Sequence, residues 1–131
     1  SINGCSMLVR SSSLGKIGLM DESYFLYWED TEWCARANDF GYKILYVPTS
    51  KVWHKVSSTT GQGSFSLYYY STRNGLRFLI DRDLILVPFF AFYTAISVVK
   101  FMIKGNLNPL KGYCVGLSHF LLGKYGPRTA N

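Results

Sequence analysis

The stretch Trp28-Glu29-Asp30-Thr31-Glu32-Trp33 is the densest polar cluster in this chain of 131 residues. The sequence predicts that its carboxylates lie in the first turn of a helix that starts near Glu29 or Asp30. This helix runs to Phe40, and Gly41 stands just beyond its end. Acidic residues in a first turn complement the helix dipole, so Asp30 could simply cap the helix. The flanking tryptophans favour a binding site instead, because aromatic faces beside carboxylates make a platform for sugar rings.

Short elements are predicted on both sides of this cluster. A serine-rich segment can start a helix over residues 11–17, and Gly18 would end it. Apolar runs predict strands over residues 4–9, 42–47 and 51–55, the second of them stopped by Pro48.

His54 follows Asp30 by 24 positions and directly precedes a segment of Ser, Thr, Gly and Gln over residues 57–63. That composition is typical of a loop. A lone histidine is more often structural than a ligand, but its place at a strand end raises a metal or phosphate role as an alternative. His119 has no polar partner nearby in sequence, and we interpret it as structural.

The second half of the chain is more apolar and more basic. A helix is predicted over residues 64–82. Leu84–Ile103 then runs for 20 positions with Lys100 as its only charge, which as a helix would reach about 30 Å, the thickness of a bilayer core. Pro109 can start a last helix that ends near Leu122. The alternative for the long apolar segment is a helix buried in a soluble core or in a dimer interface, so a homo-oligomer stays open.

Charge and cysteine content narrow the functional classes. The whole net charge of +6 lies in residues 64–131, the apolar half, which favours an anionic membrane surface over nucleic acid. The aromatic residues lie in apolar runs and are not interleaved with Lys and Arg, which argues against a nucleic-acid binder. The three cysteines form no CxxC pair, so a reducing, cytosolic setting fits. The chain has no initiator Met and no visible signal peptide, and it reads as part of a longer protein.

Several ordered motifs resemble the second half of family-2 glycosyltransferases. They cover about residues 2–82, and the last of them resembles the bacterial rhamnosyltransferase and galactofuranosyltransferase branch. The motifs are Gly4-Cys5-Ser6-Met7-Leu8-Val9-Arg10, Gly18-Leu19-Met20-Asp21-Glu22-Ser23-Tyr24-Phe25, Tyr27-Trp28-Glu29-Asp30-Thr31-Glu32-Trp33-Cys34-Ala35-Arg36, Gly41-Tyr42-Lys43-Ile44-Leu45-Tyr46-Val47-Pro48, Val52-Trp53-His54 and Tyr69-Tyr70-Ser71-Thr72-Arg73-Asn74.

The resemblance implies an α/β fold: the C-terminal half of an A-type glycosyltransferase domain over residues 1–82, followed by hydrophobic, basic, membrane-associating helices over residues 83–131. It implies that Asp30 is the catalytic base, since a carboxylate within about 3 Å of an acceptor hydroxyl can take its proton. Glu29 would support Asp30. Trp28, Trp33 and Arg73 would contact substrate, Arg73 through a phosphate or the acceptor.

The resemblance also implies the partners of the chain. His54 matches a position that helps hold Mg²⁺ or Mn²⁺ on the diphosphate of a nucleotide-sugar donor, and the acceptor would be a glycan or a lipid-linked sugar. The remaining metal ligands would lie in a nucleotide-binding half before Ser1, without which this chain should be inactive. We expect the protein at the cytoplasmic face of the membrane. The alternative is a non-catalytic, membrane-associated binding module.

Overall fold

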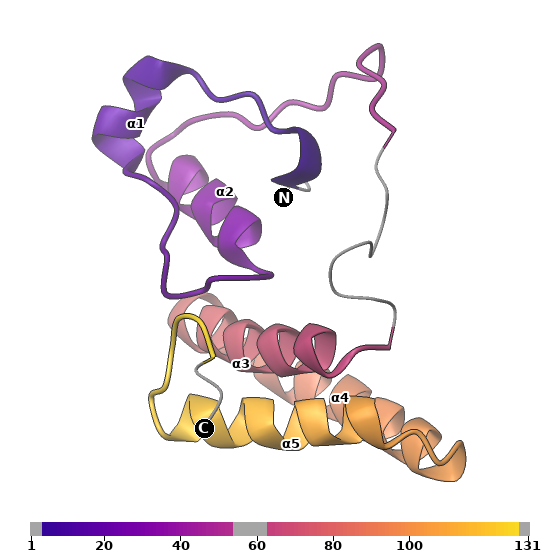
Figure 1. The fold of residues 1–131 in the computed structure, drawn as a ribbon. Coiled ribbons are helices and arrows are strands. Elements are labelled where there is room, and N and C mark those ends of the chain that lie inside the picture. Colours follow the sequence, from indigo (N-terminus) through magenta and orange to yellow (C-terminus); the bar gives the residue numbers. More distant parts are fainter. Residues whose placement is uncertain (1–3, 54–62, 129–131) are drawn as a thin grey trace.

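The computed structural model describes residues 4–53 and 63–128, in which helices and irregular loops alternate (Figure 1). The N-terminal group holds the short turn η1 (Gly4–Ser6) and the helices α1 (Ser11–Ile17) and α2 (Glu29–Asp39). The C-terminal group holds α3 (Phe65–Arg82), the short turn η2 (Leu84–Leu86), α4 (Val87–Ile103) and α5 (Leu107–Leu121). In Figure 1 the segment after α5 turns back over α3 toward the loop that leads into α2.

The N-terminal group is built on a small apolar core between α1 and α2. Ile17, Trp33 and Ala37 are buried there, with Met7 and Val9 packed against them. Gly18 ends α1 with φ 82°, as predicted, since glycine adopts positive φ at little cost. The predicted serine cap is wrong: Arg10 precedes the first turn, and Ser13 instead donates its hydroxyl to the Arg10 carbonyl at 2.6 Å.

Helix α2 ends as the sequence predicts, but the strands predicted around it are absent from the described residues. Gly41 has φ 77°, and its N–H bonds the carbonyl of Asn38 at 2.9 Å. Residues 42–47 are irregular, and residues 4–6 form η1. A strand needs a hydrogen-bonded neighbour to satisfy its backbone, and no described segment supplies one. The predicted α/β sheet is therefore not seen in this part of the chain.

The C-terminal group depends on a close approach of α5 to α3. Gly112 and Gly116, four residues apart on α5, face the backbone of α3, and both are buried. A Cβ atom placed on Gly116 would lie 2.6 Å from the carbonyl oxygen of Tyr69. Small residues at this spacing let two helix backbones touch. His119 lies near them, where its Nδ1 and the Tyr69 hydroxyl are 2.8 Å apart, so its structural interpretation is consistent with the fold.

Helix α4 packs on the rest of the protein along one side. Phe90 reaches Trp28, with ring centroids 6.3 Å apart, and Phe101 reaches Tyr68 at 5.2 Å. The other side is open: no residue of α4 is buried, and large apolar side chains are exposed at Phe89, Phe92, Tyr93, Val99, Met102 and Ile103. Leu84–Ile103 is long and apolar enough to cross a membrane, by length and composition alone.

Candidate functional site

Asp30 lies in the first turn of α2, where two backbone N–H groups hold its carboxylate. The N–H of Gly4 donates to Oδ2 at 2.8 Å, and the N–H of Thr31 donates to Oδ1 at 2.7 Å. Asp30 does not cap the helix, because the residue before the first turn is Trp28 and no side chain caps this end. Asp30 is half-buried, so it is fixed in place and still reachable.

Glu29 stands beside Asp30 in a less hydrated setting. Its Oε2 atom is buried and has no hydrogen-bond partner within the described part of the chain. Burial raises the pKa of the Glu29 carboxyl, the carboxylate of Asp30 adds to the rise, and a backbone hydrogen bond opposes it. The two adjacent carboxyl groups therefore differ in environment, and Glu29 holds its proton to higher pH than an exposed glutamate does.

The two tryptophans of the motif have different surroundings. Trp33 is buried in the small core, and its Nε1 donates to the carbonyl of Gly18 at 2.9 Å. Trp28 is half-buried, with its ring 5.3 Å from that of Phe78 on α3, centroid to centroid. Trp33 therefore packs inside the protein, and of the two tryptophans only Trp28 has part of its surface open.

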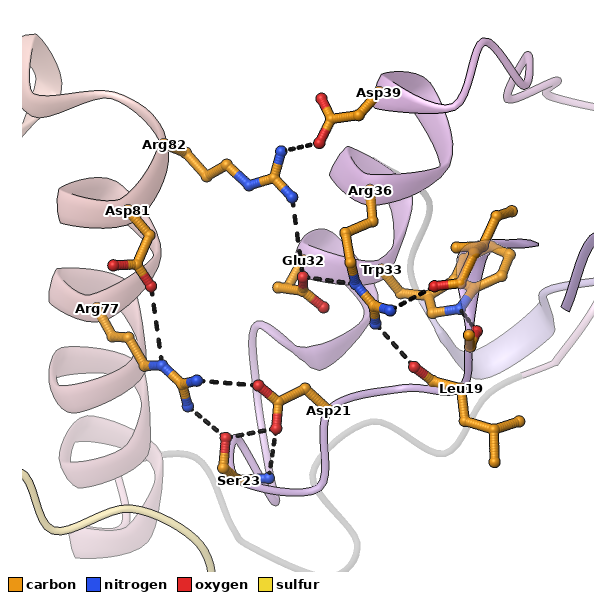
Figure 2. Close-up of polar contacts among 12 residues, drawn as sticks. Leu19, Asp21, Ser23, Glu32, Trp33, Arg36, Asp39, Arg77, Asp81 and Arg82 are labelled. Carbon is orange, nitrogen blue, oxygen red and sulfur yellow. Dashed lines mark hydrogen bonds and ion pairs between the residues drawn. The ribbon is translucent and has the colours of Figure 1, made fainter. Parts of the chain in front are cut away.

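Ion pairs join α3 to α2 and to the loop that precedes α2 (Figure 2). Arg82 of α3 bonds Asp39 and lies 3.9 Å from Glu32, and Glu32 also pairs with Arg36 at 2.7 Å. Arg77 of α3 pairs with Asp21 at 2.9 Å and bonds the Ser23 hydroxyl. Sequence reasoning did not find the contacts between α3 and the N-terminal group. The four-residue spacing that could have indicated an ion pair occurs only within single helices, at Glu32–Arg36 and Arg77–Asp81.

Arg73, predicted to contact substrate, is deeply buried in α3. Only 1% of its surface is exposed. Its guanidinium donates to protein carbonyls, to Gly126 at 2.8 Å and to Tyr24 at 3.1 Å. The predicted contact with a phosphate or an acceptor has no support in this placement, which gives Arg73 a structural function.

Asn74, next to Arg73, is a residue whose importance the sequence reasoning missed. It is fully buried, and it bonds the loop that enters α2. Its place beside Arg73 in the Tyr69-to-Asn74 motif was the only signal that could have identified it.

The predicted metal ligand His54 lies outside the described residues. Within residues 4–53 and 63–128, no group of three or more His, Cys, Asp or Glu side chains could hold a metal ion. The predicted Mg²⁺ or Mn²⁺ site at His54 therefore stays a prediction.

No family model matches the chain. No solved structure matches it either. Two curated proteins match the chain. Both are N-acetylglucosaminyl-diphospho-decaprenol L-rhamnosyltransferase, from two strains of Mycobacterium tuberculosis. Each is 35% identical to this chain over 81 residues. The chain is related to a glycosyltransferase. The match covers 62% of this chain and 26% of each relative, so the chain spans about a quarter of the length of these proteins.

Proposed function

We propose that this chain is the acceptor-side part of an inverting glycosyltransferase, with Asp30 as its catalytic base. The observation that carries the proposal is the Asp30 carboxylate, held by two backbone N–H groups at the open end of α2, in a chain 35% identical to a rhamnosyltransferase over 81 residues. The family-2 assignment, the A-type sheet and a separate nucleotide-binding part belong to the same proposal.

The chemistry is a single displacement at the anomeric carbon of the donor sugar. The acceptor oxygen forms the new bond to this carbon as the bond from the carbon to the diphosphate oxygen breaks. Asp30 accepts the hydroxyl proton of the acceptor during this step. Because the acceptor attacks from the face opposite the diphosphate, the configuration at this carbon inverts. The N–H groups of Gly4 and Thr31 fix the direction of the carboxylate, which keeps it aligned for proton transfer.

The relative's name suggests the substrate classes. We propose a nucleotide-linked rhamnose or related sugar as the donor, and a lipid-linked sugar diphosphate as the acceptor. His54 with Mg²⁺ or Mn²⁺ stays a prediction: His54→Ala should raise the metal concentration needed for half-maximal activity, because one ligand is lost. An unchanged metal titration would return His54 to a structural role.

We further propose that α4 lies in the cytoplasmic face of the membrane. Its exposed apolar side is continuous with η2, where Leu84 and Ile85 are also exposed. Its other side packs on Trp28 and Tyr68. Because protein covers one side of α4, lipid can reach only the other side, as for a helix that lies in the plane of the membrane.

The proposal is tested with what we call the complete enzyme: this chain joined to a nucleotide-binding N-terminal part, either from its own reading frame or from the M. tuberculosis relative. The enzyme is incubated with a panel of nucleotide sugars and a short lipid-linked acceptor, and the anomeric configuration of the product is read by NMR. We expect transfer with inversion. Folded enzyme that binds the donor and transfers no sugar would support the non-catalytic module instead.

A further inference from the structure

The loop that enters α2 has an unusual backbone. Within residues 23–28, here called the entry turn, Phe25, Tyr27 and Trp28 have φ of 62°, 63° and 75°. For residues other than glycine this left-handed region is costly, and three such residues within four positions persist only where the surroundings impose them. Trp28 immediately precedes α2. The conformation of the entry turn therefore sets the direction in which the side chains of Glu29 and Asp30 extend from the backbone.

Among the side chains of α3 that contact the entry turn, Asn74 bonds the most of its carbonyls. It is fully buried, and its Nδ2 donates to the carbonyls of Tyr24 and Leu26 at 2.8 Å and to that of Tyr27 at 2.9 Å. The two N–H groups of one amide are thus shared among three carbonyls of the turn, of which that of Tyr24 also accepts from the N–H of Leu26 at 2.8 Å. A buried carbonyl left without a donor would be costly.

Arg73 fixes the orientation of that amide. Its Nε donates to Oδ1 of Asn74 at 2.9 Å, and because Nε can only donate, the oxygen of the amide must face Arg73 and the nitrogen must face the turn. The same guanidinium bonds the carbonyl of Tyr24 at 3.1 Å and that of Gly126 at 2.8 Å. Arg73 and Asn74 together therefore hold the turn from within α3.

We propose that Asn74, oriented by Arg73, is a positioning residue that sets the place of the Asp30 carboxylate through the entry turn. The proposal rests on Asp30 being the base. It assigns Asn74 no contact with substrate, since the side chain is closed off from solvent. A displacement of about 1 Å at a reacting group can cost up to about 100-fold in rate, so a turn held by one amide can limit turnover without changing donor affinity.

The variant Asn74→Asp tests the proposal in the complete enzyme. It keeps the size of the side chain and an oxygen for Arg73, and it removes the donors to the turn. We expect turnover to fall by about 10- to 100-fold with donor affinity within about twofold, and amide exchange in residues 24–32 to quicken by about 10-fold. Unchanged exchange in these residues would overturn the proposal. The matched control is Thr72→Val, because the Thr72 hydroxyl is buried on the same helix without a partner in the described residues, and its loss should change neither quantity.

A second variant separates positioning from stability. Gly15→Ala on α1 lies outside the entry turn, and its added methyl group meets nothing within 4 Å, so it should restore part of the thermal stability of the Asn74→Asp enzyme. By itself it should keep normal turnover. If Asn74 positions Asp30, the double variant regains Tm and stays slow. If turnover returns together with Tm, Asn74 only stabilises the fold and the proposal fails.

A different set of results would show that Asp30 is not the base. Asp30→Asn should lower turnover and leave amide exchange in residues 24–28 unchanged. Normal turnover in Asp30→Asn would remove Asp30 as the base, whereas the exchange measurement on Asn74→Asp would still report whether Asn74 holds the turn.

Discussion

Asp30 and Asp39 lie at opposite ends of the same helix and offer a matched pair of substitutions. Asp30→Asn should leave donor binding intact and lower turnover of the complete enzyme by at least ~100-fold, the usual contribution of a general base. Asp39→Asn removes only the contact with Arg82 at the far end of α2 and should change turnover little. Steady-state kinetics with a saturating donor measure both. Comparable rates for the two variants would contradict the assignment.

Glu29 gives a prediction on pH. Burial raises the pKa of the Glu29 carboxyl above its ordinary 4.5. As the pH rises past 4.5, Glu29 ionises in the unfolded state before it ionises in the folded state, where the charge is partly buried and therefore unfavourable. Stability is therefore lost as pH rises from about 4.5 through the raised pKa. Glu29→Gln removes this effect. Its Tm should exceed that of the parent chain at pH 7 and converge with it near pH 4, as thermal unfolding at several pH values can check. A constant difference would contradict the burial of this carboxyl.

The sequence could predict individual residues of the candidate site but not the contacts between them. Asp30 and Glu29 could be proposed as site residues from the sequence, because acidic residues between two tryptophans form a recognisable motif. That Trp33 points into the core, and that Arg73 and Asn74 bond a loop about fifty positions earlier, depends on how α3 lies against the entry turn. Nothing in local spacing encodes that contact.

Among the elements, the glycines of α5 give the clearest test of packing. Gly116→Ala would place a methyl group 2.6 Å from the Tyr69 carbonyl oxygen, so α5 must move away from α3. We expect a loss of about 1–3 kcal/mol in the free energy of unfolding. Gly15→Ala on α1 meets nothing within 4 Å and should instead stabilise by about 0.5–1 kcal/mol. Chemical denaturation measures both. Equal effects would rule out close packing of α5 on α3.

Helices and strands were predictable to different degrees for a physical reason. A helix satisfies its own backbone, so the predicted segments 11–17, 29–40 and 64–82 match α1, α2 and α3 closely, and Ser64 caps α3 by accepting from the N–H of Leu67 at 3.2 Å. A strand is completed by another segment. The apolar residues 42–47 meet none in the described part of the chain, and Leu45 and Tyr46 are left exposed.

At the scale of the whole molecule, some basic residues of the C-terminal group bond other protein groups, whereas others are exposed to solvent. Arg73, Arg77 and Arg82, which precede the apolar segment, bond protein groups on the N-terminal group. Lys100, Lys104 and Lys111 are exposed near the end of α4 and on α5. Lysines available to anionic lipid therefore lie at the end of α4 and at the start of α5.

Vesicle flotation tests this arrangement. The chain should float with vesicles that contain anionic lipid at low salt. The double variant Lys104→Glu/Lys111→Glu should weaken binding about 30-fold or more, from about 1 kcal/mol for each basic residue near the surface. The control is Lys43→Glu/Lys51→Glu, the same charge change at exposed positions of the N-terminal group. Chain that stays soluble with anionic lipid, or an equal loss in both variants, would contradict membrane docking through α4.

The contacts of Gly126 have a consequence for the order in which the protein is made. Its N–H bonds the carbonyl of Ser23 at 2.7 Å, and its carbonyl accepts from Arg73 at 2.8 Å. Residues near Asp30 leave the ribosome early, and α1 and α2 can form while synthesis continues. The entry turn still lacks its last contacts until residue 126 has emerged and folded back. The candidate site is thus among the first parts of this chain to be translated and among the last to reach its final geometry.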